Sequence, residues 1–174
     1  MSKAKIGYIG VGLMGHGAAK NILEKGHPLT IMGHRNRAPV DDLIKRGASE
    51  GKSAAEITRA SDILFLCLPS SVEVEATVYG AGGVLEGAHA GLIVVDSTTA
   101  DPNSTRRIAA DLAAKGARML DAPLGRTPKE AEEGKLSTYV GGDAAIFAAV
   151  KPVFDTYADT VIHVGALGDR KSVV

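Results

Sequence analysis

Tryptophan is absent from this sequence, and only 4% of its residues are aromatic. Glycine is common instead, at 21 of 174 residues, which favours close packing of helices on a sheet over an aromatic cage around a ligand. An excess charge of either sign is also lacking, because 20 basic residues balance 20 acidic ones. Nothing therefore indicates a surface for nucleic acid or membrane, and we expect small-molecule partners.

Cysteine is almost absent as well. Cys67 is the only one, so no disulfide can form within the chain, and a reducing compartment is indicated. Long apolar runs are missing, and the polar residues 1–5 lead directly into a short strand pattern rather than a secretory signal. We therefore predict a cytoplasmic protein. Its length suits one domain with a sizeable core.

The most informative motif follows the first apolar run, residues 5–9, and precedes a helical pattern over 18–23. It has the spacing G-x-G-x-x-G. The first glycine allows a tight turn, the second leaves room for a pyrophosphate, and the third lets the helix pack closely on its strand. The amino end of the helix attracts the anion. The residues predicted to bind a dinucleotide here are Gly10, Val11, Gly12, Leu13, Met14 and Gly15.

Strand and helix patterns alternate along the rest of the chain. Right-handed crossovers between such elements give a doubly wound, mostly parallel sheet with helices on both faces, an α/β fold of the Rossmann type. Residues 127–135 fit a loop or a short helix, and residues 48–49 at most a stub of strand. The other expected strands are 29–32, 63–68, 92–95, 117–120, 136–140 and 161–164, and the other expected helices are 40–46, 54–60, 71–79, 102–115 and 144–157.

The segment after the second expected strand bears on the choice of nicotinamide cofactor. An NAD-binding domain would carry Asp or Glu at the end of that strand, whereas Gly33 stands there and no acid lies between Gly33 and Asp41. A guanidinium can hold a 2′-phosphate through two charge-assisted hydrogen bonds, and an acid would repel it. The sequence thus favours NADP(H), with NAD(H) as the alternative. The predicted contacts are Gly33, His34, Arg35, Asn36 and Arg37.

Several motifs occur along the chain at residues 9–15, 20–27, 66–69, 95–99 with Pro102, 121–123, 134–136 and 141–142. In this order they resemble the β-hydroxyacid dehydrogenase family, the group of 3-hydroxyisobutyrate dehydrogenase and tartronate semialdehyde reductase. The resemblance implies reversible hydride transfer between a nicotinamide and a small hydroxy acid or its semialdehyde. It also implies that Cys67, Leu68 and Pro69 border the cofactor and that Thr98 lies beside nicotinamide and substrate. Thr98 could instead only cap the following helix.

One loop departs from the family pattern. Residues 121–123 are usually followed by Ser-Gly-Gly, which receives the substrate carboxylate, but here Leu124-Gly125-Arg126-Thr127 follows, as in sulfolactaldehyde reductase. The resemblance implies substrate contacts from Thr98, Gly125, Arg126 and Thr127. An arginine in this loop could hold a carboxylate, sulfonate or phosphonate, so we expect a small anionic hydroxy acid or semialdehyde. The alternative is that Arg126 is only a solvent-facing charge.

A second departure concerns the general acid. In the family, a turn after the last strand leads into a helix whose lysine protonates the substrate oxygen. Here that turn is 165–170, the lysine position falls on Val174, and Lys171 comes too early. We therefore expect a cofactor domain over 1–164 and, over 165–174, the shortened start of a linker to an all-helical domain. Either the chain is shortened, or residues beyond Gly168 are a foreign or frameshifted end.

Because the family lysine is absent, no catalytic residue is assigned, and no metal site is expected. We expect the chain alone to bind cofactor with little or no turnover, and the full-length form to be a homo-oligomer. Two other functions remain open. One is an imine reductase-like domain, which shares the glycine loop and an arginine after the second strand. The other is a non-catalytic dinucleotide-binding module that senses redox state or pairs with another chain.

Overall fold

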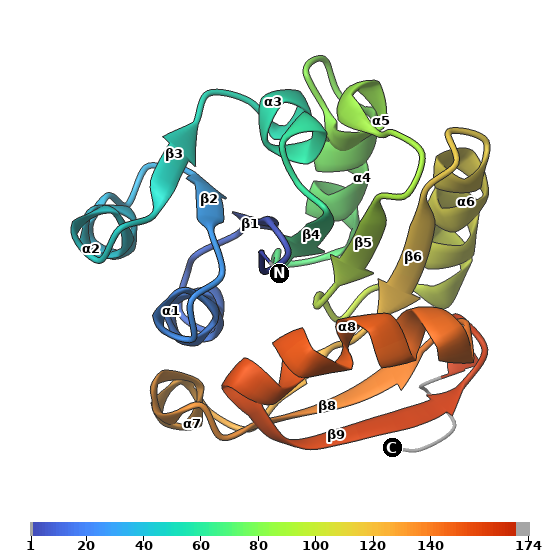
Figure 1. Cartoon of the computed structure of the whole chain (residues 1–174). Helices are drawn as coiled ribbons and strands as arrows, with labels where there is room; N and C mark the ends of the chain where they lie inside the picture. Colours follow the sequence, from blue (N-terminus) through green and yellow to red (C-terminus); the bar gives the residue numbers. More distant parts are fainter. Residues whose placement is uncertain (1, 170–174) are drawn as a thin grey trace.

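The computed structural model describes residues 2–169, and these form an α/β fold around one sheet. Figure 1 shows the sheet with helices on either side of it. The strands are β1 Ile6–Ile9, β2 Leu29–Met32, β3 Ser49–Gly51, β4 Ile63–Leu66, β5 Ile93–Asp96, β6 Arg118–Asp121, β7 Leu124–Gly125, β8 Leu136–Gly141 and β9 Ala158–Gly165. The helices are α1 Gly15–Glu24, α2 Ala38–Lys45, α3 Ala54–Arg59, α4 Ser71–Tyr79, α5 Val84–Gly87, α6 Pro102–Ala113, α7 Pro128–Glu133 and α8 Ala144–Tyr157.

The first six strands are parallel and lie in the order β3-β2-β1-β4-β5-β6. In the register of this sheet, Tyr8 of β1 lies between Ile31 of β2 and Phe65 of β4. The chain moves outward from β1 to β3 and then crosses back to β4 on the other side of β1. Ligands of such sheets bind where the strand order reverses, at the carboxyl ends of the strands. Here that point lies between β1 and β4.

The remaining strands extend the sheet beyond β6. Strand β8 runs antiparallel to β6 and β7, with Asp121 opposite Gly141 and Leu124 opposite Thr138, and β9 is parallel to β8. The expected mostly parallel, doubly wound sheet is confirmed. Strand β9 begins three residues before the expected segment 161–164, because Ala158 and Thr160 already pair with β8.

Two apolar clusters cover the two faces of the sheet. Strand β4 is buried on both sides, so alternate residues enter different clusters: Phe65 packs with Tyr8, Ile22 and the residues of α8, and Leu64 packs on the other face. The second cluster joins α3, α4 and α6 to the sheet, with Ile57, Val78, Leu92, Val94 and Leu112 as buried members. This two-sided burial fixes the carboxyl ends of β1 and β4 in a rigid frame.

Several helix ends agree with the sequence. Ser53 caps α3 by accepting a hydrogen bond from the Glu56 amide, and α6 begins at Pro102. The cap of α6 is Asp101, so the idea that Thr98 caps this helix is wrong. Residues 128–133 form the short helix α7, and Gly134 ends it with φ +72°. Helix α5 follows the glycine-rich residues 80–83 and was not expected.

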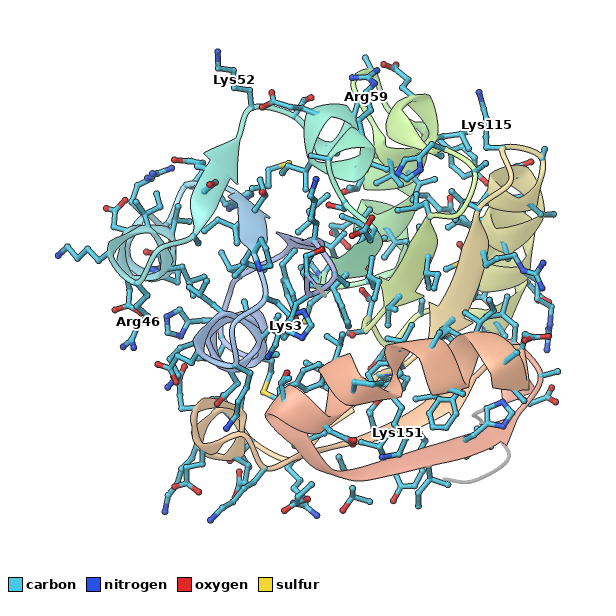
Figure 2. All side chains as sticks on the ribbon, viewed as in Figure 1. Lys3, Arg46, Lys52, Arg59, Lys115 and Lys151 are labelled. Carbon is cyan, nitrogen blue, oxygen red and sulfur yellow. The ribbon has the colours of Figure 1, made fainter. Side chains whose placement is uncertain are left out.

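Three cations at the surface lie beside different elements. Lys52 follows β3, Arg59 ends α3 and Lys115 follows α6, and all three project outward (Figure 2). Within residues 2–169, no helix is both long and apolar enough to cross a bilayer. The same residues contain no cluster of three or more His, Cys, Asp or Glu side chains suited to a metal ion.

Candidate dinucleotide-binding site

The glycine loop connects β1 to α1, and two of its glycines are required by close backbone contacts. Gly10 has φ +106°, and a Cβ on it would lie 2.0 Å from the Cys67 carbonyl oxygen. A Cβ on Gly15 would lie 1.9 Å from the Gly10 carbonyl oxygen. Gly12 differs, because a Cβ there would meet no protein atom within 4 Å. The open space beside Gly12 is what a bound pyrophosphate needs.

A cavity of about 750 Å³ opens over this loop at the carboxyl ends of β1, β2 and β4. Helix α1 begins at Gly15 on the cavity wall, so its positive end faces the cavity. The walls bring together most of the residues predicted for cofactor binding. Those predicted residues are Gly10, Val11, Gly12, Leu13, Met14, Gly15, Gly33, His34, Asn36, Cys67, Leu68 and Pro69.

Cys67 lines the cavity, and its thiol is unreactive. Its amide donates a hydrogen bond of 2.9 Å to the Ile9 carbonyl, which extends the pairing of β1 with β4. Burial raises the pKa of its thiol to about 11, so the protonated form dominates at neutral pH. A protonated thiol is a poor nucleophile, and the half-buried Cys67 shapes the wall of the cavity.

Sequence reasoning missed one wall of the cavity. Helix α4 contributes Glu73, Ala76 and Thr77, and Ser70 both caps this helix and donates a hydrogen bond to Glu73. That hydrogen bond lowers the pKa of Glu73. One feature of the sequence could have predicted this wall: α4 directly follows β4, the strand at which the strand order reverses. The helical pattern of α4, however, does not indicate which of its residues face the cavity.

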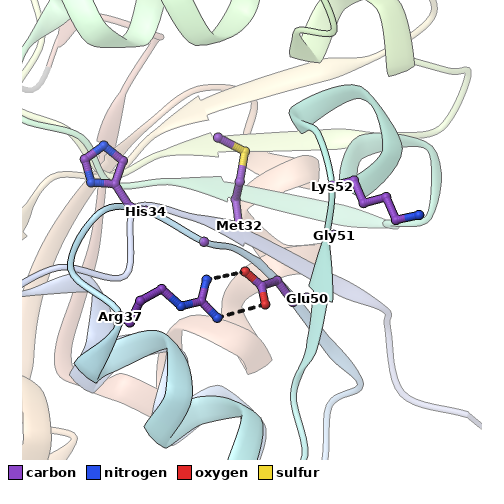
Figure 3. Close-up of a pocket in the computed structure, with 7 residues that line it drawn as sticks. Met32, His34, Arg37, Glu50, Gly51 and Lys52 are labelled. Atoms are coloured by element: carbon purple, nitrogen blue, oxygen red, sulfur yellow. Dashed lines mark hydrogen bonds and ion pairs between the residues drawn. The ribbon is translucent and has the colours of Figure 1, made fainter.

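A second cavity, of about 630 Å³, adjoins the first and shares Met32, Gly33 and His34 with it. Its distinctive feature is an ion pair: Arg37 donates from Nη1 to Oε1 of Glu50 at 2.6 Å and from Nη2 to Oε2 at 3.0 Å (Figure 3). Arg37 Nη2 also donates to Asp41 at 3.2 Å. The hydrogen bonds from Arg37 lower the pKa of Glu50 and those to Glu50 raise the pKa of Arg37. Arg35 is exposed and lines neither cavity.

Glu50 lies on β3, where Ile31 of the neighbouring strand is its partner in the register. A Cβ on Gly33 would lie 2.1 Å from Glu50 Oε1. The sequence places no acid at the end of β2, but the sheet brings one there from β3. Sequence reasoning missed Glu50 because it considered only the residues that follow β2 along the chain.

Thr98 lies at the carboxyl end of β5, and its side chain is held by the neighbouring strand. Its hydroxyl accepts a hydrogen bond of 3.0 Å from the Leu68 amide, and its own amide donates to Asp96 at 2.9 Å. Thr98 is only 2% exposed and is not among the residues lining the two cavities. It therefore fixes Leu68, which does line the cofactor cavity.

The segment predicted to bind substrate, residues 124–127, also lies outside both cavities, and its first two residues form β7 rather than part of a loop. Arg126 has φ +78° and donates to the Lys135 carbonyl at 2.6 Å, to Asp159 Oδ1 at 2.7 Å and to Thr160 Oγ1 at 3.1 Å. It is thus bound to the residue before β8 and to β9 rather than free in solvent. Gly125 lies against the Ser137 hydroxyl, and Thr127 forms a capping box with Glu130 at α7.

Helix α7 connects this loop to the glycine-loop helix. The His16 ring of α1 lies between two carboxylates, with Nδ1 2.6 Å from Glu132 and Nε2 2.7 Å from Asp42. Lys20 also pairs with Glu132, at 2.7 Å. These contacts join α1 to α2 and α7. The predicted positions Lys171 and Val174, which bear on the family's lysine, lie outside the described residues.

A glycine loop between β1 and α1, and a cavity where the strand order reverses, define a dinucleotide-binding domain of the Rossmann type. Residues 5–165 match the model of the NAD binding domain of 6-phosphogluconate dehydrogenase, and the chain belongs to this family.

Individual relatives resemble this chain in sequence and in structure. The chain is 37% identical over 169 residues to the 2-hydroxy-3-oxopropionate reductase of Escherichia coli K12, covering 97% of this chain and 57% of the relative. The solved 3-hydroxyisobutyrate dehydrogenase of Mycobacterium tuberculosis, studied with L-serine, is 28% identical with a TM-score of 0.86, covering 97% of this chain and 56% of that one.

A solved structure of Psf3 with NADP+ and 2-OPP is 29% identical with a TM-score of 0.89, covering 97% of this chain and 59% of that one. The resemblance to the β-hydroxyacid dehydrogenases is confirmed by these relatives. The chain spans little more than half the length of the proteins it matches.

Proposed function

We propose that this chain is the cofactor-binding part of an oxidoreductase that transfers hydride between NADP(H) and a small anionic 3-hydroxy acid or its semialdehyde. The observation that carries the proposal is the cavity of about 750 Å³ bounded by the glycine loop and by Cys67, Leu68 and Pro69. The likeness to a 2-hydroxy-3-oxopropionate reductase supports the substrate class. A nicotinamide supplies the hydride chemistry, and the protein supplies its position.

The preference for NADP(H) rests on the cationic groups after β2. His34 lines both cavities, Arg37 lines the smaller one, and Arg35 is exposed on the same loop. A 2′-phosphate bound near Gly33 would meet these groups, and guanidinium groups bind phosphate through paired hydrogen bonds. The Psf3 complex with NADP+ shows that one structural relative takes this cofactor. NAD(H) is the alternative cofactor.

For the substrate we propose contacts from Thr98, Gly125, Arg126 and Thr127. Arg126 is the candidate for the anionic group, because a guanidinium can hold a carboxylate, sulfonate or phosphonate. Its present partners are one carboxylate, one hydroxyl and one carbonyl, so an incoming anion would replace the Asp159 carboxylate at 2.7 Å. A hydroxyl at Thr98 would keep Leu68 in place against the cofactor.

Turnover needs a proton donor to the substrate oxygen, which contributes a factor of about 10² to 10⁴ in such reactions. No lysine within residues 2–169 lines the larger cavity. We therefore propose that residues 1–164 bind the cofactor and that the chain alone oxidises NADPH very slowly with a short carboxylated semialdehyde. We further propose that it acts in the cytoplasm and that the full-length form is a homo-oligomer. Rapid NADPH oxidation by the chain alone would contradict the requirement for a further acid.

The first test is titration calorimetry of the chain with NADPH and, separately, with NADH. We expect both to bind and NADPH to bind more tightly. Gly12→Ala should weaken both by at least about tenfold, because its methyl group enters the open space without touching protein. Its thermal unfolding temperature should stay near that of the wild type, which shows that the loss comes from the site.

A matched pair of charge variants tests the cofactor preference. Arg35→Ala should weaken NADPH more than NADH, whereas Lys115→Ala, which removes a cation beyond α6 and outside both cavities, should change neither. Tighter binding of NADH would overturn the choice of NADP(H). Binding of neither cofactor would overturn the dinucleotide function itself.

A further inference from the structure

The guanidinium of Arg37 is shared by two acids. Both terminal nitrogens of Arg37 donate to Glu50, at 2.6 and 3.0 Å, and Nη2 also donates to Asp41 at 3.2 Å. The three groups together carry a net charge of about −1 at neutral pH, from one cation and two carboxylates. A phosphate dianion that approaches Arg37 therefore meets a locally negative group rather than a free cation.

The Arg37–Glu50 pair lies beside the cofactor cavity. Glu50 and Arg37 line the smaller cavity, which meets the cofactor cavity at Met32, Gly33 and His34. A Cβ on Gly33 would lie 2.1 Å from Glu50 Oε1 and 2.5 Å from Arg37 Nη1. The Glu50 carboxylate thus occupies the space of the side chain that, in NAD-binding domains, accepts the ribose hydroxyl. Both side chains are partly exposed and accessible to a ligand.

Other charged groups of the cavity are less suited to replace Arg37. Lys52 lines the same cavity, but its side chain points away from the ion pair (Figure 3). His34 lies at the junction of the two cavities, but an imidazole lacks the paired, parallel N–H groups with which a guanidinium binds a phosphate. The bidentate donor beside Gly33 is therefore Arg37, and its availability depends on Glu50.

We propose that Glu50 is the residue that sets the selectivity between NADPH and NADH, by holding Arg37. With NADH, the ion pair stays intact and the Glu50 carboxylate accepts a hydrogen bond from the ribose 2′-hydroxyl. With NADPH, Arg37 leaves Glu50 and donates both hydrogen bonds to the 2′-phosphate. Glu50 thereby limits the preference for NADPH and allows both cofactors to bind. This inference rests on the proposed dinucleotide function of the cavity.

The test is a double-mutant cycle on the ratio of the dissociation constants, Kd for NADH divided by Kd for NADPH. Glu50→Gln keeps the shape of the side chain and removes its charge, so the ratio should rise by roughly tenfold. In the Arg37→Ala background, the same Glu50→Gln change should raise the ratio by a clearly smaller factor, because only the direct effect of the Glu50 charge on the ribose 2′-group remains and there is no guanidinium to release.

Glu24→Gln serves as the matched control. It breaks another Glu–Arg pair, with Arg46 at 2.8 Å, and neither member of that pair lines a cavity. It should leave the ratio unchanged. An unchanged or lower ratio in Glu50→Gln, or an equal rise with and without Arg37, would overturn the role of Glu50 while the cofactor site stands. Failure of the wild type to bind either cofactor would instead overturn the proposed function, and this inference with it.

Discussion

The glycine loop and the loop over residues 124–127 both follow strands of one sheet, but they are held in different ways. The glycine loop is fixed by its backbone, because Gly10 and Gly15 allow approaches that any Cβ would block. The second loop is fixed by a side chain, since Arg126 bonds to Lys135, Asp159 and Thr160. The first loop therefore keeps its shape before a ligand arrives, whereas the second would have to exchange hydrogen bonds to receive the anion proposed for it.

The largest effect on the free energy of unfolding is expected within the glycine loop. Gly10→Ala should lower the free energy of unfolding by about 3 kcal/mol, because it combines a left-handed backbone at φ +106° with a Cβ 2.0 Å from a carbonyl oxygen. Gly12→Ala should change it by less than about 0.5 kcal/mol, since its Cβ meets open space. Urea denaturation of both variants measures the difference. Equal losses of stability in the two variants would contradict the division in which Gly10 is needed for the fold and Gly12 for the ligand.

The two loops also differ in how far the sequence predicts them. The G-x-G-x-x-G spacing, the strand before it and the helix after it lie within 20 residues, and the structure has all three as expected. The Ser53 cap and the start of α6 at Pro102 are local in the same way. Such features depend on backbone preferences of neighbouring residues, so a single sequence is enough to predict them.

The contacts that sequence reasoning missed join distant residues. Arg37 and Glu50 are 13 positions apart, Arg126 and Asp159 are 33 apart, and His16 and Glu132 are 116 apart. Each depends on which strands become neighbours and in which register, and charge patterns along the chain do not encode this. The cofactor cavity was therefore largely predictable, whereas the charge environment of Arg37 and Arg126 was not.

An intermediate effect on the free energy of unfolding is expected at Arg126. Arg126→Ala should lower the free energy of unfolding by about 1 to 2 kcal/mol, because three hydrogen bonds are lost from a partly exposed side chain. Arg126→Gly removes the same side chain but suits φ +78°, so it should be about 1 kcal/mol more stable than the alanine variant. Urea denaturation of the pair isolates the backbone contribution. A glycine variant less stable than the alanine variant would contradict this strain.

The smallest effect on stability is expected at the two carboxylates that contact His16 of α1. These are Asp42 of α2 and Glu132 of α7. Hydrogen bonds from Arg46 and then His16 lower the pKa of Asp42. Burial tends to raise the pKa of Glu132, but hydrogen bonds from Lys20 and His16 outweigh it and lower that pKa. Because both folded-state values are depressed, the unfolded chain takes up more protons as the pH falls. Their contribution is complete above the unfolded pKa of about 4 and is lost as the pH falls through the lower folded values.

The double variant Asp42→Asn with Glu132→Gln tests this joint. Its free energy of unfolding should fall less steeply than that of the wild type between pH 6 and pH 3. The difference should be at most about 1 kcal/mol, because both carboxylates are more than a third exposed and solvent screens the pairs. Denaturation curves at the two pH values measure it, with Asp155→Asn on α8 as a control outside the network. Parallel pH dependence in all three proteins would mean that α1 is held to α7 by packing of Gly17 on Ala131 rather than by these charges.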